Sequence, residues 1–126
     1  MTVGVSTVNV ANKWLDALRN VSFVNTATYG ELHTADPGAA GTTAVANSST
    51  RQLFTFSAAA SGAIALSGSP AFTGTATETI THIAFFSAST AGTFLWSATL
   101  TASKLINSGD TLTFTSAGIS ITPLAA

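Results

Sequence analysis

The sequence contains no cysteine and very few charged side chains. The absence of cysteine from all 126 residues excludes disulfides, thiolate metal ligands and a cysteine nucleophile. Only 7% of the residues are charged, whereas roughly 25% are charged in an average soluble domain. The four lysines and arginines are scattered and the net charge is −1, so no basic surface is available to contact phosphates. We therefore expect no nucleic-acid partner.

Long apolar runs are also missing. No uninterrupted apolar stretch approaches the ~20 residues that span a bilayer. The charged residues Lys13, Asp16 and Arg19 interrupt the apolar pattern near the start of the chain, which is not typical of a signal peptide. The sequence therefore predicts no membrane partner.

Small neutral residues take the place of charge. Hydrophobic residues make up 46% of the chain, and serine, threonine, alanine and glycine are left to form most of the surface. Such a surface is easily desolvated, so we interpret the protein as one that works packed against copies of itself or other proteins. The alternative is an ordinary threonine-rich β protein. The length, with no linker and no repeat, predicts a single domain over residues 1–126.

The stretch from Glu78 to Leu100 is the most informative part of the sequence. It is typical of two strands joined by a turn at residues 89–92, with apolar side chains on both faces of each strand. A hairpin of this kind is covered on both sides and lies near the middle of a fold. The predicted core or interface positions here and on an earlier strand are Phe54, Phe56, His82, Phe86, Phe94 and Trp96.

Shorter alternating segments surround this hairpin and predict an all-β fold, a sandwich or jelly roll of about eight short strands. Residues 39–50 are expected to form a long exposed loop, and residues 103–109 a connection that ends in a turn. The further strands are expected within residues 26–34, 51–59, 63–66, 71–77, 111–115 and 119–121.

One segment, residues 8–20, has a helical period instead. Its apolar stripe is formed by Val10, Ala11, Trp14, Leu15 and Leu18. Two interpretations are open: a helix that closes the core through Trp14 and Leu18, or a helix that docks onto a neighbouring subunit. The single stripe favours the first.

Candidate binding residues lie in and after the strand expected at residues 26–34. Tyr29, Glu31 and His33 alternate on one face, with Gly30 a possible bulge, and a type II turn is expected to begin at Asp36.

A glutamate, a histidine and an aspartate could together hold a divalent cation. However, no second histidine is near and the turn aims Asp36 independently, so we expect no metal. Asp36 is expected to hydrogen-bond its own turn, which makes Pro37 and Gly38 structural residues. His33 is expected to bond backbone or a neighbour, and Tyr29 is the candidate for an exposed ring that could stack on a sugar.

No pattern supports catalysis. The sequence has no G-x-S-x-G elbow, no P-loop and no dinucleotide fingerprint, and its five carboxylates are far apart. We therefore expect a non-enzymatic protein that has neither catalytic residues nor a cofactor.

The run from Gly30 to Thr42, GELHTADPGAAGT, resembles a pattern of small structural proteins of tailed bacteriophages, known as minor tail or tail-fibre-like proteins. The likeness continues through residues 11–20, 51–60, 78–82, 94–96 and 108–112 and so covers nearly the whole chain. It implies a β-rich part of the virion, made in the host cytoplasm, that assembles with other virion proteins and with copies of itself, most simply as a trimer. A capsid decoration protein and a glycan-binding adhesion module are the alternatives.

Overall fold

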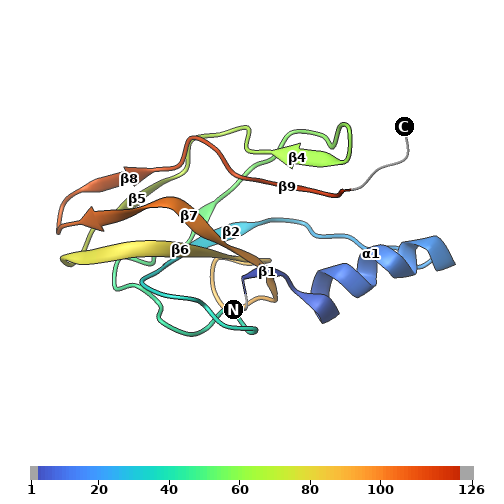
Figure 1. Ribbon diagram of the computed structural model, residues 1–126, viewed down its shortest axis with the longest axis horizontal. Helices are drawn as coiled ribbons and strands as arrows, with labels where there is room; N and C mark the ends of the chain where they lie inside the picture. Colours follow the sequence, from blue (N-terminus) through green and yellow to red (C-terminus); the bar gives the residue numbers. More distant parts are fainter. Residues whose placement is uncertain (1–2, 123–126) are drawn as a thin grey trace.

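A five-stranded antiparallel sheet forms the centre of the fold (Figure 1). The computed structural model describes residues 3–122. The strand order is β1-β7-β6-β2-β3, so the strands that neighbour each other in space come from both ends of the chain. The strands of this sheet are β1 (Gly4–Val5), β2 (Tyr29–His33), β3 (Gln52–Leu53), β6 (Glu78–Phe86) and β7 (Phe94–Ile106).

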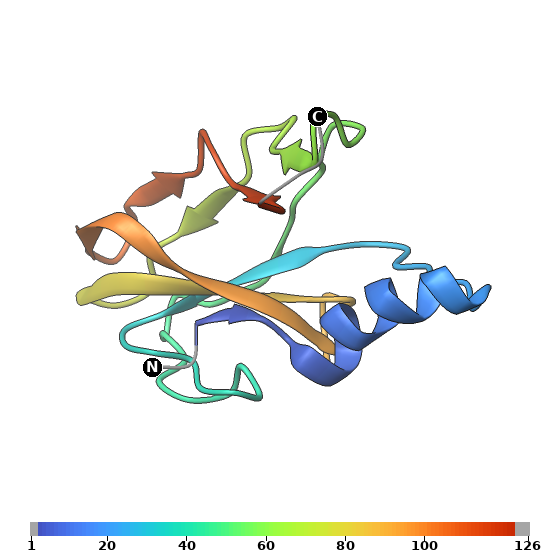
Figure 2. The same ribbon diagram turned by 45° about the vertical axis from the view of Figure 1, so that its right-hand side comes forward.

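Two small two-stranded sheets cover one face of this central sheet. β4 (Ala63–Ala65) pairs with β9 (Gly118–Ser120), and β5 (Ala71–Thr73) pairs with β8 (Thr111–Thr113). Both pairs lie above the central sheet in Figures 1 and 2. The predicted all-β sandwich is therefore confirmed. The main core fills the space between the layers and includes Leu32, Phe54, Phe72, Ile83, Phe85 and Trp96.

The hairpin β6–β7 lies at the centre of the sheet, as its two apolar faces predict. On the main-core face, the rings of Phe85 and Trp96 stack with their centroids 3.9 Å apart. On the opposite face, Ala84, Phe86 and Phe94 form a second, smaller buried cluster. Apolar side chains on both faces of a strand thus correspond to two separate cores.

Two local expectations were wrong. β7 does not end near Leu100 but continues to Ile106, because Ile106 is buried and pairs with Glu78, beyond a shift in register between Ile80 and His82. Gly30 is not a bulge: its pairing with Phe85 is regular, and a Cβ there would lie 2.5 Å from the Phe54 ring. The loop after Gly38 is not wholly exposed, as described below.

The outer edge of β7 is open along much of its length. β1 pairs only with Trp96 and Ser97, and within residues 3–122 no strand pairs with the outer edge of residues 98–105. Lys104 is the one charged side chain in that stretch. An unpaired edge presents a row of free backbone hydrogen-bonding groups.

The expected N-terminal helix is present, but it projects from the body of the protein (Figures 1 and 2). It is continuous over residues 7–19: a wide first turn at Thr7–Ala11, α1 (Asn12–Asp16), and a tighter last turn at Ala17–Arg19. The Ser6 side chain accepts a hydrogen bond from the Asn9 amide and caps the first turn. Asn20, in the left-handed region with φ 63°, ends the helix.

The interpretation of this helix as a lid on the core is wrong. Val10 is buried, but the Trp14 side chain is 36% exposed and Leu18 is 87% exposed. The reason is the place where the helix is attached. The Ser6 amide donates to the Leu95 carbonyl, and the Asn9 side chain donates to the Phe94 carbonyl. Both contacts are at the start of β7, where the sheet stops, so the later turns of the helix extend past it.

Candidate functional site

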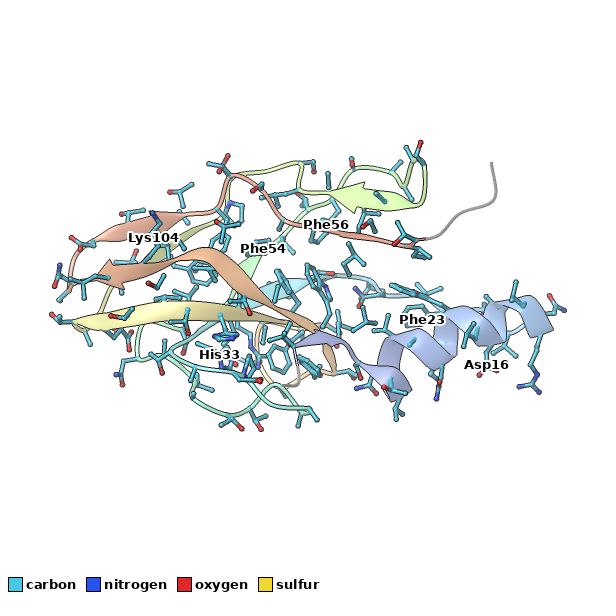
Figure 3. The ribbon with its side chains drawn as sticks, viewed as in Figure 1. Asp16, Phe23, His33, Phe54, Phe56 and Lys104 are labelled. Carbon is cyan, nitrogen blue, oxygen red and sulfur yellow. The ribbon has the colours of Figure 1, made fainter. Side chains whose placement is uncertain are left out.

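The strand β2 carries three of the four predicted binding residues on one face. Its register sets Tyr29 opposite Phe86, Glu31 opposite Ala84 and His33 opposite His82. This is the face of the smaller core, and in Figure 3 His33 lies on the other side of the sheet from Phe54 and Phe56. Tyr29 is half-buried in the sheet, so a fully exposed aromatic platform is not found there.

Glu31 is paired with Arg51, a residue that the sequence did not single out as part of a site. Arg51 Nε donates to Glu31 Oε2 over 2.8 Å, and both side chains are largely buried. The pairing follows from the sheet, because Gly30 lies opposite Gln52 and the next residues along each strand therefore face each other. The signal present in the sequence was an acidic residue on one expected strand and a basic residue at the start of the next, which can pair where two strands are neighbours.

Arg51 also holds the turn of the central hairpin. One guanidinium nitrogen donates to the carbonyls of Ala88, at 3.1 Å, and Ala91, at 2.6 Å. The guanidinium lies 3.6 Å from the centre of the Phe86 ring, which is a cation–π contact. One side chain thus connects β2, β6 and the β6–β7 turn.

His33 is fully buried and fastens the loop that follows β2. Its Nδ1 lies 2.7 Å from the Thr43 carbonyl oxygen, and because a carbonyl only accepts, Nδ1 carries the proton and donates. Its Nε2 lies 3.4 Å from Glu31 Oε1 but makes no aligned hydrogen bond. The expectation that His33 bonds to backbone is confirmed.

The loop of residues 34–48 is folded back over the smaller core. Asp36 Oδ1 accepts a hydrogen bond from the Gly38 amide at 2.9 Å, so Asp36 stabilises its own turn as expected. Gly38 has φ 76°, which a type II turn requires of its third residue. Pro37 and Gly41 are buried, and Gly41 lies directly against Phe94 and Phe86. The buried residues of the loop therefore cover Phe86 and Phe94, while most of residues 39–50 are exposed, as predicted.

The far end of this loop is held by Glu78, at the start of β6. The Glu78 carboxylate accepts hydrogen bonds from the amides of Asn47, at 2.9 Å, and Ser48, at 2.7 Å. Burial raises the pKa of Glu78, but the hydrogen bonds from Ser48 and Asn47 outweigh burial and leave the pKa below its ordinary value.

The same balance applies to Glu31. Burial raises the pKa of its carboxyl, but the contact with His33, the hydrogen bond from Arg51 and the charge of Arg51 together bring the pKa below the ordinary value. Glu31 is thus a stable carboxylate bound to a guanidinium. Such a group is suited to holding structure, because its charge is already neutralised by a partner.

The structure does not bring the four predicted binding residues together into one site. Asp36 binds its own turn, Tyr29 belongs to the sheet, and Glu31 and His33 form a buried cluster with Arg51. His82, the other histidine, accepts or donates a 2.7 Å hydrogen bond with its neighbour Thr81. Among residues 3–122 no three histidine or carboxylate side chains are arranged to hold a metal ion.

The surface offers two other features. One is an open groove of about 370 Å³ between β7 and residues 112–118, walled by Leu100, Leu112 and Phe114. The other is the projecting arm, which we define as residues 7–26: the helix and the segment that returns to β2. On the arm Phe23 is half-buried, whereas the chain around it is largely exposed (Figure 3).

The comparison with known protein families decides the class of the protein. Residues 4–122 match the model of the family described as podophage GP4 fiber I protein gp80. The match extends over nearly the whole chain. The chain belongs to this family. A search of curated proteins finds no match.

Membership of the fiber I protein gp80 family makes the chain a phage tail-fibre-like structural protein and a component of the virion. The resemblance to tail-fibre-like proteins is thereby confirmed at the level of the family, while the significance of the L-H-T-A-D-P-G run stays a prediction. The helix of the fibre protein is too short and too polar to cross a membrane, and the rest of residues 3–122 contains no helix that could.

Proposed function

We propose that the protein is a non-enzymatic fibre or tail-tip subunit of a bacteriophage, which acts by assembling with copies of itself, as a trimer, and with other virion proteins. The observation that carries this proposal is the match of residues 4–122 to a family of phage fibre proteins. A fibre subunit needs a rigid shape and surfaces that bind neighbours, and no reacting group.

The rigidity of the fold supports this role. The buried cluster of Glu31, His33 and Arg51 connects two strands, a hairpin turn and the loop of residues 34–48. With the Glu78 carboxylate it fastens both ends of that loop. The charges of Glu31, Arg51 and Glu78 are each hydrogen-bonded within the subunit and His33 is fully buried, so these contacts hold the subunit together.

The surface supports assembly. The accessible surface of the chain is 7236 Å², whereas a compact monomer of 12.7 kDa exposes about 6,200 Å². Large apolar side chains are exposed on it, among them Val8, Leu18 and Val24. Because only 7% of the residues are charged, removing water from this surface against a neighbour costs little free energy.

Immunogold electron microscopy on particles of the phage that encodes the chain tests the location. Antibodies raised against the purified chain are expected to label the tail or its fibres. Labelling confined to the head would instead indicate a capsid decoration protein, and particles without any label would contradict a virion role. Light scattering on the purified chain tests the trimer, for which a mass three times the 12.7 kDa of one chain is expected.

A further inference from the structure

Three apolar side chains of the helix at residues 7–19 follow a regular spacing. Ala11, Leu15 and Leu18 are separated by four and then three residues, and all three fall on one face of the helix. Leu15 is 64% exposed, and Leu18, nearer the tip, is more exposed still. The face is apolar along its length, yet the described residues leave most of it uncovered.

The helix gains little support from its own body. The contacts that fix it lie in its first turn, where the Asn9 side chain reaches the Phe94 carbonyl and Val10 is buried. A helix of about 12–15 residues is marginal in water when it stands alone. An apolar surface supplied from elsewhere would therefore stabilise the outer turns of this one.

The charges around the face indicate which partner fits. In the heptad set by Ala11, Leu15 and Leu18, Trp14 and Arg19 flank the seam on opposite sides. Two such helices packed in parallel bring Trp14 of one copy beside Arg19 of the next, as a cation–π pair. Arg19 is also neutralised within its own helix, because its guanidinium binds Asp16 Oδ1 at 2.9 Å. Two copies can therefore pack side by side without repulsion between their Arg19 side chains.

We propose that this helix is the self-association element of the protein, and that it packs in parallel against the same helix of other copies with Ala11, Leu15 and Leu18 in the shared seam. The inference rests on the proposed function, in which copies assemble about a rotation axis. Such an axis makes equivalent helices around it run in the same direction.

The first experiment compares two double variants by sedimentation or light scattering. Leu15→Glu with Leu18→Glu places carboxylates in the seam, and the mass is expected to fall to the 12.7 kDa of one chain. The matched control is Leu53→Glu with Leu105→Glu, which changes two leucines exposed to 50% and 66% away from the helix. The control is expected to keep the oligomer. Circular dichroism verifies that both variants retain the β fold.

The outcomes separate this inference from the proposed function. An oligomer that survives Leu15→Glu with Leu18→Glu overturns the inference and leaves the virion role standing. An unaltered chain that is monomeric at high concentration overturns the inference and the trimer together, while gold labelling of the fibres would still support the virion role.

Tryptophan fluorescence gives a second readout that does not depend on the charged variants. The chain has two tryptophans: Trp14 on the helix and Trp96 in the core. In a Trp96→Phe variant, Trp14 is the sole emitter, and its emission is expected to shift to shorter wavelength and become less accessible to acrylamide as the protein concentration rises. In the unaltered chain, quenching of the accessible fraction reports the same change. Emission and quenching that are independent of concentration would overturn the inference.

Discussion

The guanidinium of Arg51 lies over the Phe86 ring, 3.6 Å from its centre, while the same group binds the Glu31 carboxylate. This one contact joins the charged cluster to the smaller core. Arg51 lies inside the fold of a protein that has so few charges because its guanidinium satisfies a carboxylate and two backbone carbonyls of the hairpin turn.

Replacing Arg51 should be costly. Arg51→Met leaves the Glu31 carboxylate without its partner in a largely buried place, and we expect the free energy of unfolding to fall by about 3 kcal/mol. Urea denaturation measures the change. Arg19→Met is the matched control, because the side chains of the Arg19–Asp16 pair are 75% and 37% exposed and such a pair contributes less than about 0.5 kcal/mol. Equal effects of the two variants would contradict the role given to the cluster.

Stability should depend on pH through Glu31 and Glu78. Both carboxyls have a pKa below the ordinary value of 4.5 in the folded protein. As the pH falls below about 4.5 the unfolded chain takes up protons first, so the contribution of these groups, complete at neutral pH, is lost as the pH approaches their lowered pKa. Free energies of unfolding measured between pH 7 and pH 3 should therefore fall less steeply for Glu31→Gln than for the unaltered chain. An equal or steeper fall would be inconsistent with the proposed balance.

Gly41 should tolerate no side chain. Gly41→Ala would drive a methyl group into the Phe94 ring at a residue with φ 70°, and we expect a loss of about 3 kcal/mol. Gly109→Ala provides the comparison, because Gly109 also has positive φ, at 90°, but an added Cβ meets no atom within 4 Å. Its loss should be about 1 kcal/mol, from backbone strain alone. Thermal denaturation of both variants separates packing from strain, and similar losses would show that the loop does not press on Phe94.

The stacked pair in the main core should carry a large share of the stability. Phe85→Ala removes a fully buried ring that stacks on Trp96, and a loss of about 3–5 kcal/mol is expected. Leu53→Ala, at a half-exposed position, should cost less than about 1 kcal/mol. Denaturation by guanidinium chloride compares the two. A small loss for Phe85→Ala would mean that the core at β6–β7 is loosely packed.

The central hairpin could be predicted because its signal is local. β6 carries apolar residues on both faces, so both faces must be buried, and a buried cluster is found on each. The turn at residues 107–110 was also predictable: the Asp110 carboxylate accepts from the Asn107 amide, and Gly109 supplies the positive φ. By contrast, the length of β7 depends on its pairing with β6 as far as Glu78, which no pattern within β7 reveals.

The candidate site was less predictable, for the same physical reason. The contact of Glu31 with Arg51 joins residues that are distant in sequence and depends on the register of β2 with β3. The sequence correctly predicts a helix with one apolar stripe, but the stripe alone does not indicate what covers it. The place where Ser6 and Asn9 are fastened decides that Leu18 lies outside the body.

The bare edge of β7 has a practical consequence for anyone who produces this protein in quantity. Backbone groups along residues 98–105 can template the growth of an added strand, and the ammonium group of Lys104 is the feature there that discourages it. Replacing Lys104 with an uncharged residue would remove the charge that opposes strand addition and would favour fibrillar aggregation. Changes meant to improve solubility are therefore best made on this strand, with the positive charge at its end kept.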